Sequence, residues 1–354
     1  MESVCFTGAC PDMTRAELTE MAEEKFEVKS SVTKDLDILV CADPSAGSSK
    51  LEKAKKNGTR IISYEDFLEM LESDDDEDED GEDGMYSEEQ AMEIIWRIND
   101  TMEKEAIRIK THEAESPLSM TASKFGGLPY WTAGEEYPKD DDGNELTLLA
   151  QINFSDVPHL PDYPEKGLLQ FFILADSSVW LDMEGTTQNY WRVVWREDVD
   201  ESLALSADAL HEMGVQSAAE VVDDGRDFPF SEEFSLSFEK SLSHPNYMLW
   251  DYDEMVKRAA KELGYPVHED ASEAFPEDFR DDHMFDMFDA EQHQIGGYPN
   301  FSEYDIRNED EVLLLQIVSD EDIAWGDSGI ANFFIKPEDL KKRDFSNILC
   351  TCSY

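Results

Sequence analysis

The chain has 354 residues, enough for two or three domains, and 40% of them are hydrophobic, enough to build a core. Its 29 basic and 83 acidic residues give a net charge of −54, so its overall field repels polyanions. We therefore expect a folded protein that neither coats nucleic acid nor adheres to an anionic membrane, and any anion that it binds must occupy a local pocket.

Residues 1–72 alternate short apolar runs with amphipathic segments. Strands are predicted at 4–6, 26–29, 38–40 and 60–62, and helices from Thr14, over 49–56 and from Ser63. A capping box, Thr14-Arg15-Ala16-Glu17, opens the first helix. This order predicts an α/β domain in which a small parallel sheet is covered by helices.

The same residues contain a candidate anion site. Thr7 offers a hydroxyl and Gly8 an unobstructed N–H at a turn, while Lys50 lies in the first turn of a helix, where N–H groups favour negative charge. The segment 50–60 has five basic residues and one acidic residue, a local charge of +4. The alternative is that Thr7 only caps the turn and the lysines only solvate a helix face.

Several motifs of this region resemble the BRCT domain, in particular the copy that ends bacterial NAD-dependent DNA ligases. They are CFTGA at 5–9, TRAE at 14–17, DILV at 37–40, SKLEKAKKNG at 49–58 and RIISYEDFLEML at 60–71. One departure is Phe67, where many BRCT domains have a tryptophan. The resemblance implies that Thr7, Gly8 and Lys50 hold a phosphate, as the matching residues do in phosphopeptide-binding BRCT domains. Single BRCT domains, however, often only mediate domain contacts or touch DNA ends.

Residues 73–84, SDDDEDEDGEDG, contain nine acidic residues and no apolar one. Such a segment cannot bury a core, so we expect a flexible linker between a domain at 1–72 and a second at 85–354. Asp76, Asp78 and Asp80 match the first half of a calcium loop, but its last ligand position holds Ser87 in place of glutamate. A solvated spacer is favoured, and no metal site is expected.

Three sequence blocks occur twice in the second domain, in the same order. KFGGLPY at 124–130, LLAQI at 148–152 and GLLQFFI at 167–173 are echoed by QIGGYPN at 294–300, LLLQI at 313–317 and GIANFFI at 329–335. We infer two homologous units, about 120–175 and 290–336, separated by an insert that contains a helix near 252–263. Each unit reads as a Gly-Gly-Pro turn followed by two antiparallel strands, which predicts an α+β domain with duplicated β units.

Gln151 and Gln316 are amides within apolar strands, so each must find hydrogen-bond partners. One hypothesis is that they line a ligand pocket at a pseudo-twofold axis, together with Trp325 and Asp327 from the loop before the last repeated strand. The alternative is that the glutamines satisfy nearby backbone groups and that the loop residues cap a turn.

The repeated blocks, with EEYPKDDDGNELTLLAQINFS and LPDYPEKGLLQFFI, resemble the YwqG-like family over nearly all of residues 86–354. That family has no assigned function, so the resemblance implies a fold and no catalytic residue. His283 and His293 fit no zinc-binding pattern.

The sequence contains no nucleotide-binding, zinc-protease or serine-hydrolase motif, and no cofactor is expected. We favour a non-enzymatic binding protein whose BRCT-like domain recognises a phosphorylated protein or a 5′-phosphate DNA end, and whose YwqG-like domain binds an unknown partner or ligand. The alternatives are a DNA repair or replication accessory that binds DNA ends, and an enzyme with a site between the duplicated halves. Five cysteines without a C-x-x-C pair, no signal segment and no long apolar stretch predict a cytoplasmic protein.

Overall fold

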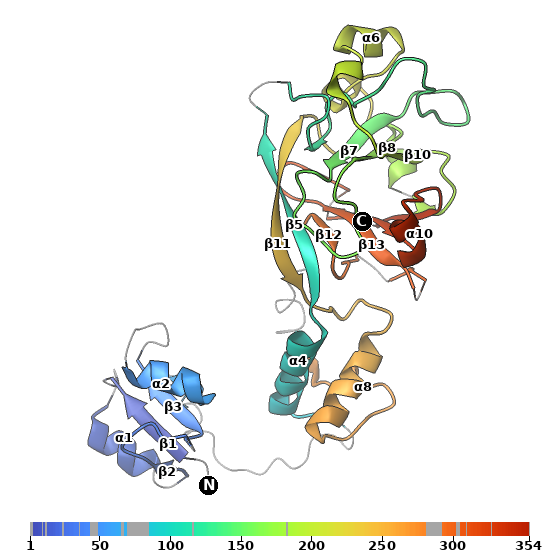
Figure 1. Ribbon diagram of the computed structural model, residues 1–354. Helices are drawn as coiled ribbons and strands as arrows, with labels where there is room; N and C mark the ends of the chain where they lie inside the picture. Colours follow the sequence, from blue (N-terminus) through green and yellow to red (C-terminus); the bar gives the residue numbers. More distant parts are fainter. Residues whose placement is uncertain are drawn as a thin grey trace. The chain divides into compact units, whose positions relative to one another are not determined.

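The computed structural model divides into two compact units, Met1–Gly81 and Glu82–Tyr354 (Figure 1). The described residues are 3–8, 10, 13–22, 25–34, 36–42, 49–64, 67–68, 85–114, 117–181, 183–280, 292–301, 305–308, 310–326 and 328–353. The predicted linker at 73–84 lies outside these ranges.

The first unit contains a parallel sheet, as predicted, and its strand order is β2-β1-β3-β4. Its elements are β1 Ser3–Thr7, α1 Arg15–Ala22, β2 Glu27–Val28, β3 Ile38–Cys41, α2 Ser49–Asn57 and β4 Arg60–Ser63. The last predicted helix lies partly outside the described residues, but Phe67 within it is fully buried.

Both faces of this sheet are buried. Val4 and Phe6 of β1 pack in one apolar cluster with Leu18 of α1, whereas Cys5 between them packs in another with Leu51 of α2. Successive side chains of a strand point to opposite faces, so a strand covered on both sides is apolar almost throughout. The continuous apolar runs of β1 and β3 follow from this arrangement.

The described part of the second unit contains one sheet in the order β10-β8-β7-β6-β11-β5-β12-β13-β14-β15-β9. The strands are β5 Lys104–Glu113, β6 Lys124–Phe125, β7 Thr147–Asn153, β8 Leu168–Ile173, β9 Glu184–Gly185, β10 Trp191–Arg196, β11 Phe234–Ser243, β12 Gln294–Gly296, β13 Val312–Val318, β14 Ile330–Ile335 and β15 Ile348–Ser353. Neighbouring strands pair antiparallel, and the long strands β5 and β11 pair along their whole length at the centre (Figure 1).

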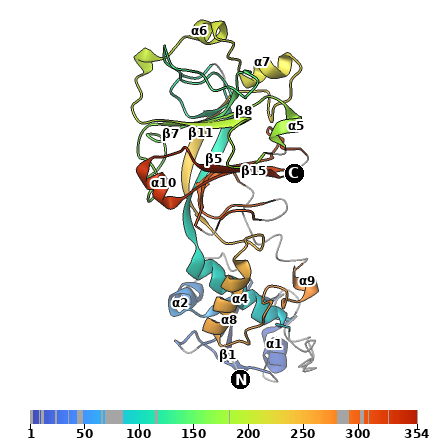
Figure 2. The ribbon, with the colours of Figure 1, turned by 90° about the vertical axis from the view of Figure 1, so that its right-hand side faces the viewer.

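We call the strands on the two sides of the central pair the two wings: β10-β8-β7-β6 and β12-β13-β14-β15-β9. The sheet curls so that these wings face each other (Figure 2). Phe171 of β8 and Phe333 of β14 are distant in the strand order, yet their ring centroids are 4.7 Å apart. Trp191 of β10 also contacts Phe333. The inner faces of both wings therefore share one apolar core.

The helices of the second unit are α4 Glu88–Met102, α5 Ser177–Trp180, α6 Ala207–Glu212, α7 Ala218–Asp223, α8 Tyr252–Leu263, α9 Glu277–Phe279 and α10 Pro337–Lys342, with a 3-10 turn at Glu201–Leu203. Ser87 and Gln90 form a capping box that begins α4. Helix α8 begins and ends where the sequence predicts it. It packs with α4 in an apolar cluster that also contains Leu313 of β13 and Phe334 of β14.

The repeated sequence blocks form matching strands. In the first unit of repetition β6 pairs with β7 and β7 with β8, and in the second β12 pairs with β13 and β13 with β14. Both β7 and β13 carry a register shift, around Leu149 and Leu314, at corresponding positions. The two strands that follow each Gly-Gly-Pro turn therefore pair antiparallel. The insert also contributes β9, β10 and β11 to the same sheet, three strands that the sequence patterns do not predict.

Candidate functional site

The structure brings Thr7, Gly8 and Lys50 to one edge of the first unit. β1 ends at Thr7, which lies in register with Cys41 at the end of β3, and the carboxyl ends of parallel strands share an edge. Lys50, in the first turn of α2, donates a hydrogen bond from Nζ to the carbonyl of Phe6 at 3.2 Å. Its ammonium group therefore lies directly beside the turn that Thr7 and Gly8 begin.

Gly8 shapes this turn. Its φ of +83° is a left-handed conformation that side-chain-bearing residues adopt at a cost, and it is exposed. The hydroxyl of Tyr64 donates to the carbonyls of Thr7 and Gly8 at 3.2 and 3.1 Å. Burial raises the pKa of this phenol, and the nearby Arg15 opposes the rise.

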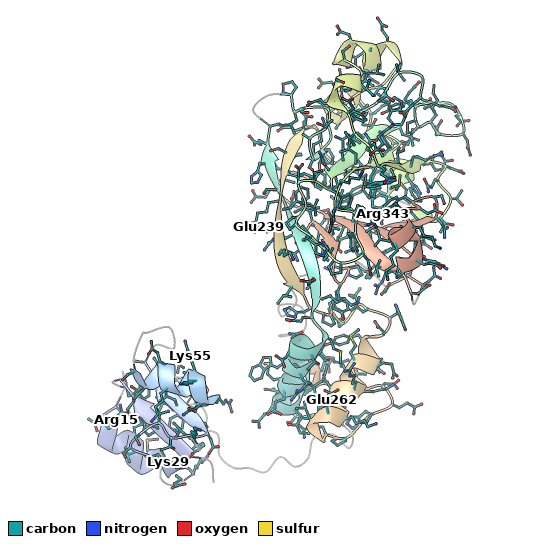
Figure 3. All side chains as sticks on the ribbon, in the orientation of Figure 1. Arg15, Lys29, Lys55, Glu239, Glu262 and Arg343 are labelled. Carbon is teal, nitrogen blue, oxygen red and sulfur yellow. The ribbon has the colours of Figure 1, made fainter. Side chains whose placement is uncertain are left out.

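Arg15 is a residue of this edge that the sequence analysis does not single out. Its guanidinium donates to the carbonyl of Gly8 and lies over the rings of Phe6 and Tyr64, from the first position of α1 (Figure 3). A signal was present, because a cation at the start of a helix opposes the helix dipole and needs a compensating contact. Together, Arg15, Lys50 and the start of α2 make this edge suitable for an anion.

The buried amide of Gln151 connects the parts of its own repeat. Gln151 accepts from the N–H of Tyr130 at 3.0 Å and donates to the carbonyl of Ala122 at 2.8 Å. Gln170 on the neighbouring strand donates to the carbonyl of Tyr130 at 2.9 Å. These bonds hold the end of the Gly-Gly-Pro turn against β7 and β8.

The second repeat contains the same bonds at the corresponding residues. Gln316 accepts from the N–H of Asn300 at 2.7 Å and donates to the carbonyl of Gln292 at 2.9 Å. Asn332 donates to the carbonyl of Asn300 at 2.8 Å. Both glutamines are fully buried and bind local backbone groups, so their contacts give no support to a role in a ligand pocket.

Trp325 is also fully buried, and it packs edge-on against Trp180. Asp327 lies outside the described residues. Three cavities of about 660, 380 and 240 Å³ occur in the second unit, and none is lined by Gln151, Gln316 or Trp325. An enzyme site between the duplicated halves would need these residues to line one cavity. None of these three cavities meets that requirement.

Within the described ranges, no three His, Cys, Asp or Glu side chains gather as a metal ion would require. No helix in the described part of the chain is long and apolar enough to cross a membrane.

Comparison with known families divides the chain in the order that its sequence predicts. Residues 3–71 match the BRCA1 C Terminus (BRCT) domain, and residues 123–353 match a family described as a domain of unknown function, DUF1963. The predicted fusion of an N-terminal BRCT domain with a family of unknown function is confirmed.

Bacterial DNA ligases are similar to a segment of this chain, and the segment has about the length of the BRCT region. The ligase of Treponema denticola is 47% identical over 70 residues, which cover 20% of this chain and 11% of the ligase. The ligase of Sorangium cellulosum is 48% identical over 63 residues, 18% of this chain and 9% of the ligase. The ligase of Methylobacterium radiotolerans is 44% identical over 71 residues, which cover 20% of this chain and 8% of the ligase. The chain thus spans about a tenth of the length of these ligases.

Proposed function

Since this chain belongs to the DUF1963 family and carries a BRCT domain at its N-terminus, we propose that it is a non-enzymatic binding protein. The BRCT domain recognises a phosphorylated partner or a phosphate end through Thr7, Gly8 and Lys50, and the DUF1963 region binds a partner or ligand. The observation that carries the proposal is the position of Lys50 Nζ, 3.2 Å from the carbonyl of Phe6 and beside the turn. This cation is a local positive charge in a chain whose net charge is −54, so it attracts an anion at a position where the overall field would repel one.

The test is binding of phosphorylated peptides and of 5′-phosphorylated nicked DNA to the full chain. We expect Thr7→Ala and Lys50→Ala to weaken binding, each by about 1.5–3 kcal/mol, because each removes a hydrogen bond to a charged group. Isothermal titration calorimetry measures the change. Lys56→Ala is the matched control, because Lys56 is an exposed lysine in the last turn of α2, about 9 Å further along the helix.

Equal affinities for all variants and both phosphorylated probes would refute the phosphate site. Binding that requires only the phosphorylated nick, and that weakens steeply with salt, would favour the second candidate function, a DNA repair or replication accessory. The similarity of the BRCT region to DNA ligases supports this second candidate.

We also propose that the DUF1963 region is built from two copies of one ancestral unit, about 120–175 and 290–336. The matching strand pairings, the matching register shifts and the matching hydrogen bonds of Gln151 and Gln316 support this proposal. The glycines of both Gly-Gly-Pro turns also share φ values near +70°. In this proposal the paired glutamines are structural, and their duplication follows from that of the turns.

A further inference from the structure

The largest of the three cavities, about 660 Å³, lies along an edge of the sheet of the second unit. The loop from Trp131 to Gly143 forms one side, and Arg192, Val194 and Arg196 of β10 form the other. In the described part of the chain β10 pairs with a strand on one side, β8, so its outer edge has no strand partner (Figure 1). An open strand edge beside a cavity is a common site for the addition of an extended peptide.

The hydrogen bonds show which backbone groups face outward. The N–H of Leu174 donates to the carbonyl of Tyr190 at 2.8 Å, so the alternating pattern of an antiparallel pair turns the N–H and C=O groups of Val193 and Trp195 away from β8. The side chain of Gln188 accepts from the N–H of Val193 at 3.2 Å. Gln188 therefore occupies a position that the backbone of an added strand would take.

The other wing shows what covers the corresponding edge. β15 pairs with β14 in the register in which β10 pairs with β8. Its outer edge is covered by β9, with Cys350 opposite Gly185 and the N–H of Cys352 donating to the carbonyl of Met183 at 2.9 Å. The residue of β10 that corresponds to Cys350 is Val193. The edge of β15 is therefore paired with the strand β9, whereas at the edge of β10 the side chain of Gln188 bonds the N–H of Val193.

The charges along the cavity indicate which segment fits. Arg196 pairs with Glu135 at 2.6 Å and stacks on Trp131, whereas Arg192 has no carboxylate partner among the described residues. Among the described residues, the buried Nε of Arg192 has no hydrogen-bond acceptor, and its guanidinium donates to the carbonyl of Gln188 at 3.1 Å. Arg192 is thus a cation available for an incoming anion.

Besides Glu135, three carboxylates line the cavity: the exposed Glu136 and Asp141, and the buried Asp140. They would repel a strongly acidic segment, so the cavity favours a single negative charge, placed at Arg192. Alternate side chains of a strand added to β10 would project over the cavity on the same face as Arg192 and Val194.

We propose that the outer edge of β10 binds an extended segment of a partner protein as an additional strand, with one acidic side chain of that segment contacting Arg192. The inference rests on the proposed binding function and assigns a partner chemistry to the DUF1963 region. It uses no residue of the BRCT domain, so Lys50→Ala should leave it intact, and the two sites can fail separately.

The probe is a synthetic threonine-rich peptide with one central glutamate, titrated against the full chain. We expect it to bind, and we expect Arg192→Gln to lower the affinity roughly tenfold or more, because a charged hydrogen bond is lost. Arg258→Gln is the matched control, since Arg258 is an exposed arginine on α8. A peptide with a central lysine should bind as weakly to the wild type as the glutamate peptide does to Arg192→Gln.

Two further measurements test the backbone pairing itself. A glutamate peptide that is N-methylated at alternate residues keeps its charge but cannot pair as a strand, so it should not bind. Gln188→Ala should strengthen binding, because it removes the side chain that competes for the N–H of Val193. Absence of binding by the unmodified peptide, or equal binding of the N-methylated one, would overturn the proposal. A dimer of the chain that forms in sedimentation and is strengthened by Gln188→Ala would do so too, since a second copy would then occupy the edge.

Discussion

At the scale of single residues, buried polar side chains of the second unit serve as links between loops and strands. His293 is 5% exposed, and its Nδ1 accepts from the N–H of Val318 at 3.1 Å. Its proton must therefore be on Nε2, which lies 3.0 Å from the carboxylate of Asp320 and donates to it. Both ring nitrogens are occupied, so this His–Asp pair is arranged for support of the loop after β13 rather than for proton transfer.

Asp320 supplies a test of pH dependence. Burial acts to raise its pKa, but hydrogen bonds from His293 and from the N–H groups of Asp322 and Ile323 outweigh burial and hold the pKa below its ordinary value. We expect Asp320→Asn to lower the free energy of unfolding by about 1–3 kcal/mol near neutral pH, because the amide can place a donor against His293.

The difference between Asp320→Asn and the wild type should depend on pH with a definite sign. Because the folded state lowers the pKa of Asp320, the contribution of the carboxylate is complete above the pKa of the unfolded chain, about 4, and is lost as the pH falls through the folded value. Urea denaturation at several pH values measures it, with the exposed Asp322→Asn as control. A difference that stays constant well below pH 4 would show that the charge of Asp320 does not contribute.

At the scale of elements, the two Gly-Gly-Pro turns place β6 and β12 against the long central strands. Gly297 has a φ of +72°, and a Cβ on it would lie 2.6 Å from the Cβ of Ser243 on β11 and 2.8 Å from that of Ala106 on β5. Real side chains do not approach so closely, so β5 and β11 can meet this turn only where the residue is glycine. The requirement comes from close contact as well as from backbone conformation.

A comparison of two glycines separates these causes. Gly143 also has a positive φ, +88°, but a Cβ on it would meet nothing within 4 Å. We expect Gly143→Ala to cost about 1 kcal/mol, from backbone strain alone, and Gly297→Ala to cost a further 1–3 kcal/mol from overpacking. Chemical denaturation of both variants gives the difference. Equal costs would mean that the strands move apart at no energetic expense.

At the scale of the whole molecule, acidity is distributed unequally. Residues 1–72 carry 9 bases and 15 acids, whereas residues 85–354 carry 20 bases and 59 acids. Each of the two compact units has its own buried clusters. We propose that the boundaries 1–72, 73–84 and 85–354 separate two independently folding domains and the segment that joins them.

Calorimetry of the full chain tests this division. We expect two unfolding transitions, because separate cores unfold as separate cooperative units. Fragments 1–72 and 85–354, made separately, should reproduce one transition each at the same temperature. A single transition in the full chain, with either fragment unfolded alone, would show that the units stabilise each other.

Local patterns in the sequence were sufficient for much of this protein. Caps, apolar alternation and repeated blocks predict the strands of the first unit, the helix α8 and the paired hairpins, because each depends on residues that are close in the chain. The adjacent residues Thr7 and Gly8 likewise predict a turn, and the lysine-rich segment predicts the helix that contains Lys50.

Only the tertiary structure decided which distant groups meet. In β5, Ile107 and Ile109 alternate with charged residues, but the pairing of this strand with β11, some 130 residues later, depends on a register that no local pattern encodes. No local pattern identifies the carbonyl group to which the side chain of Gln151 donates, or the carbonyl of Gly8 to which Arg15 donates. A buried polar group must find a partner, yet its identity follows from packing across the whole sheet, since many groups in the chain are chemically equivalent.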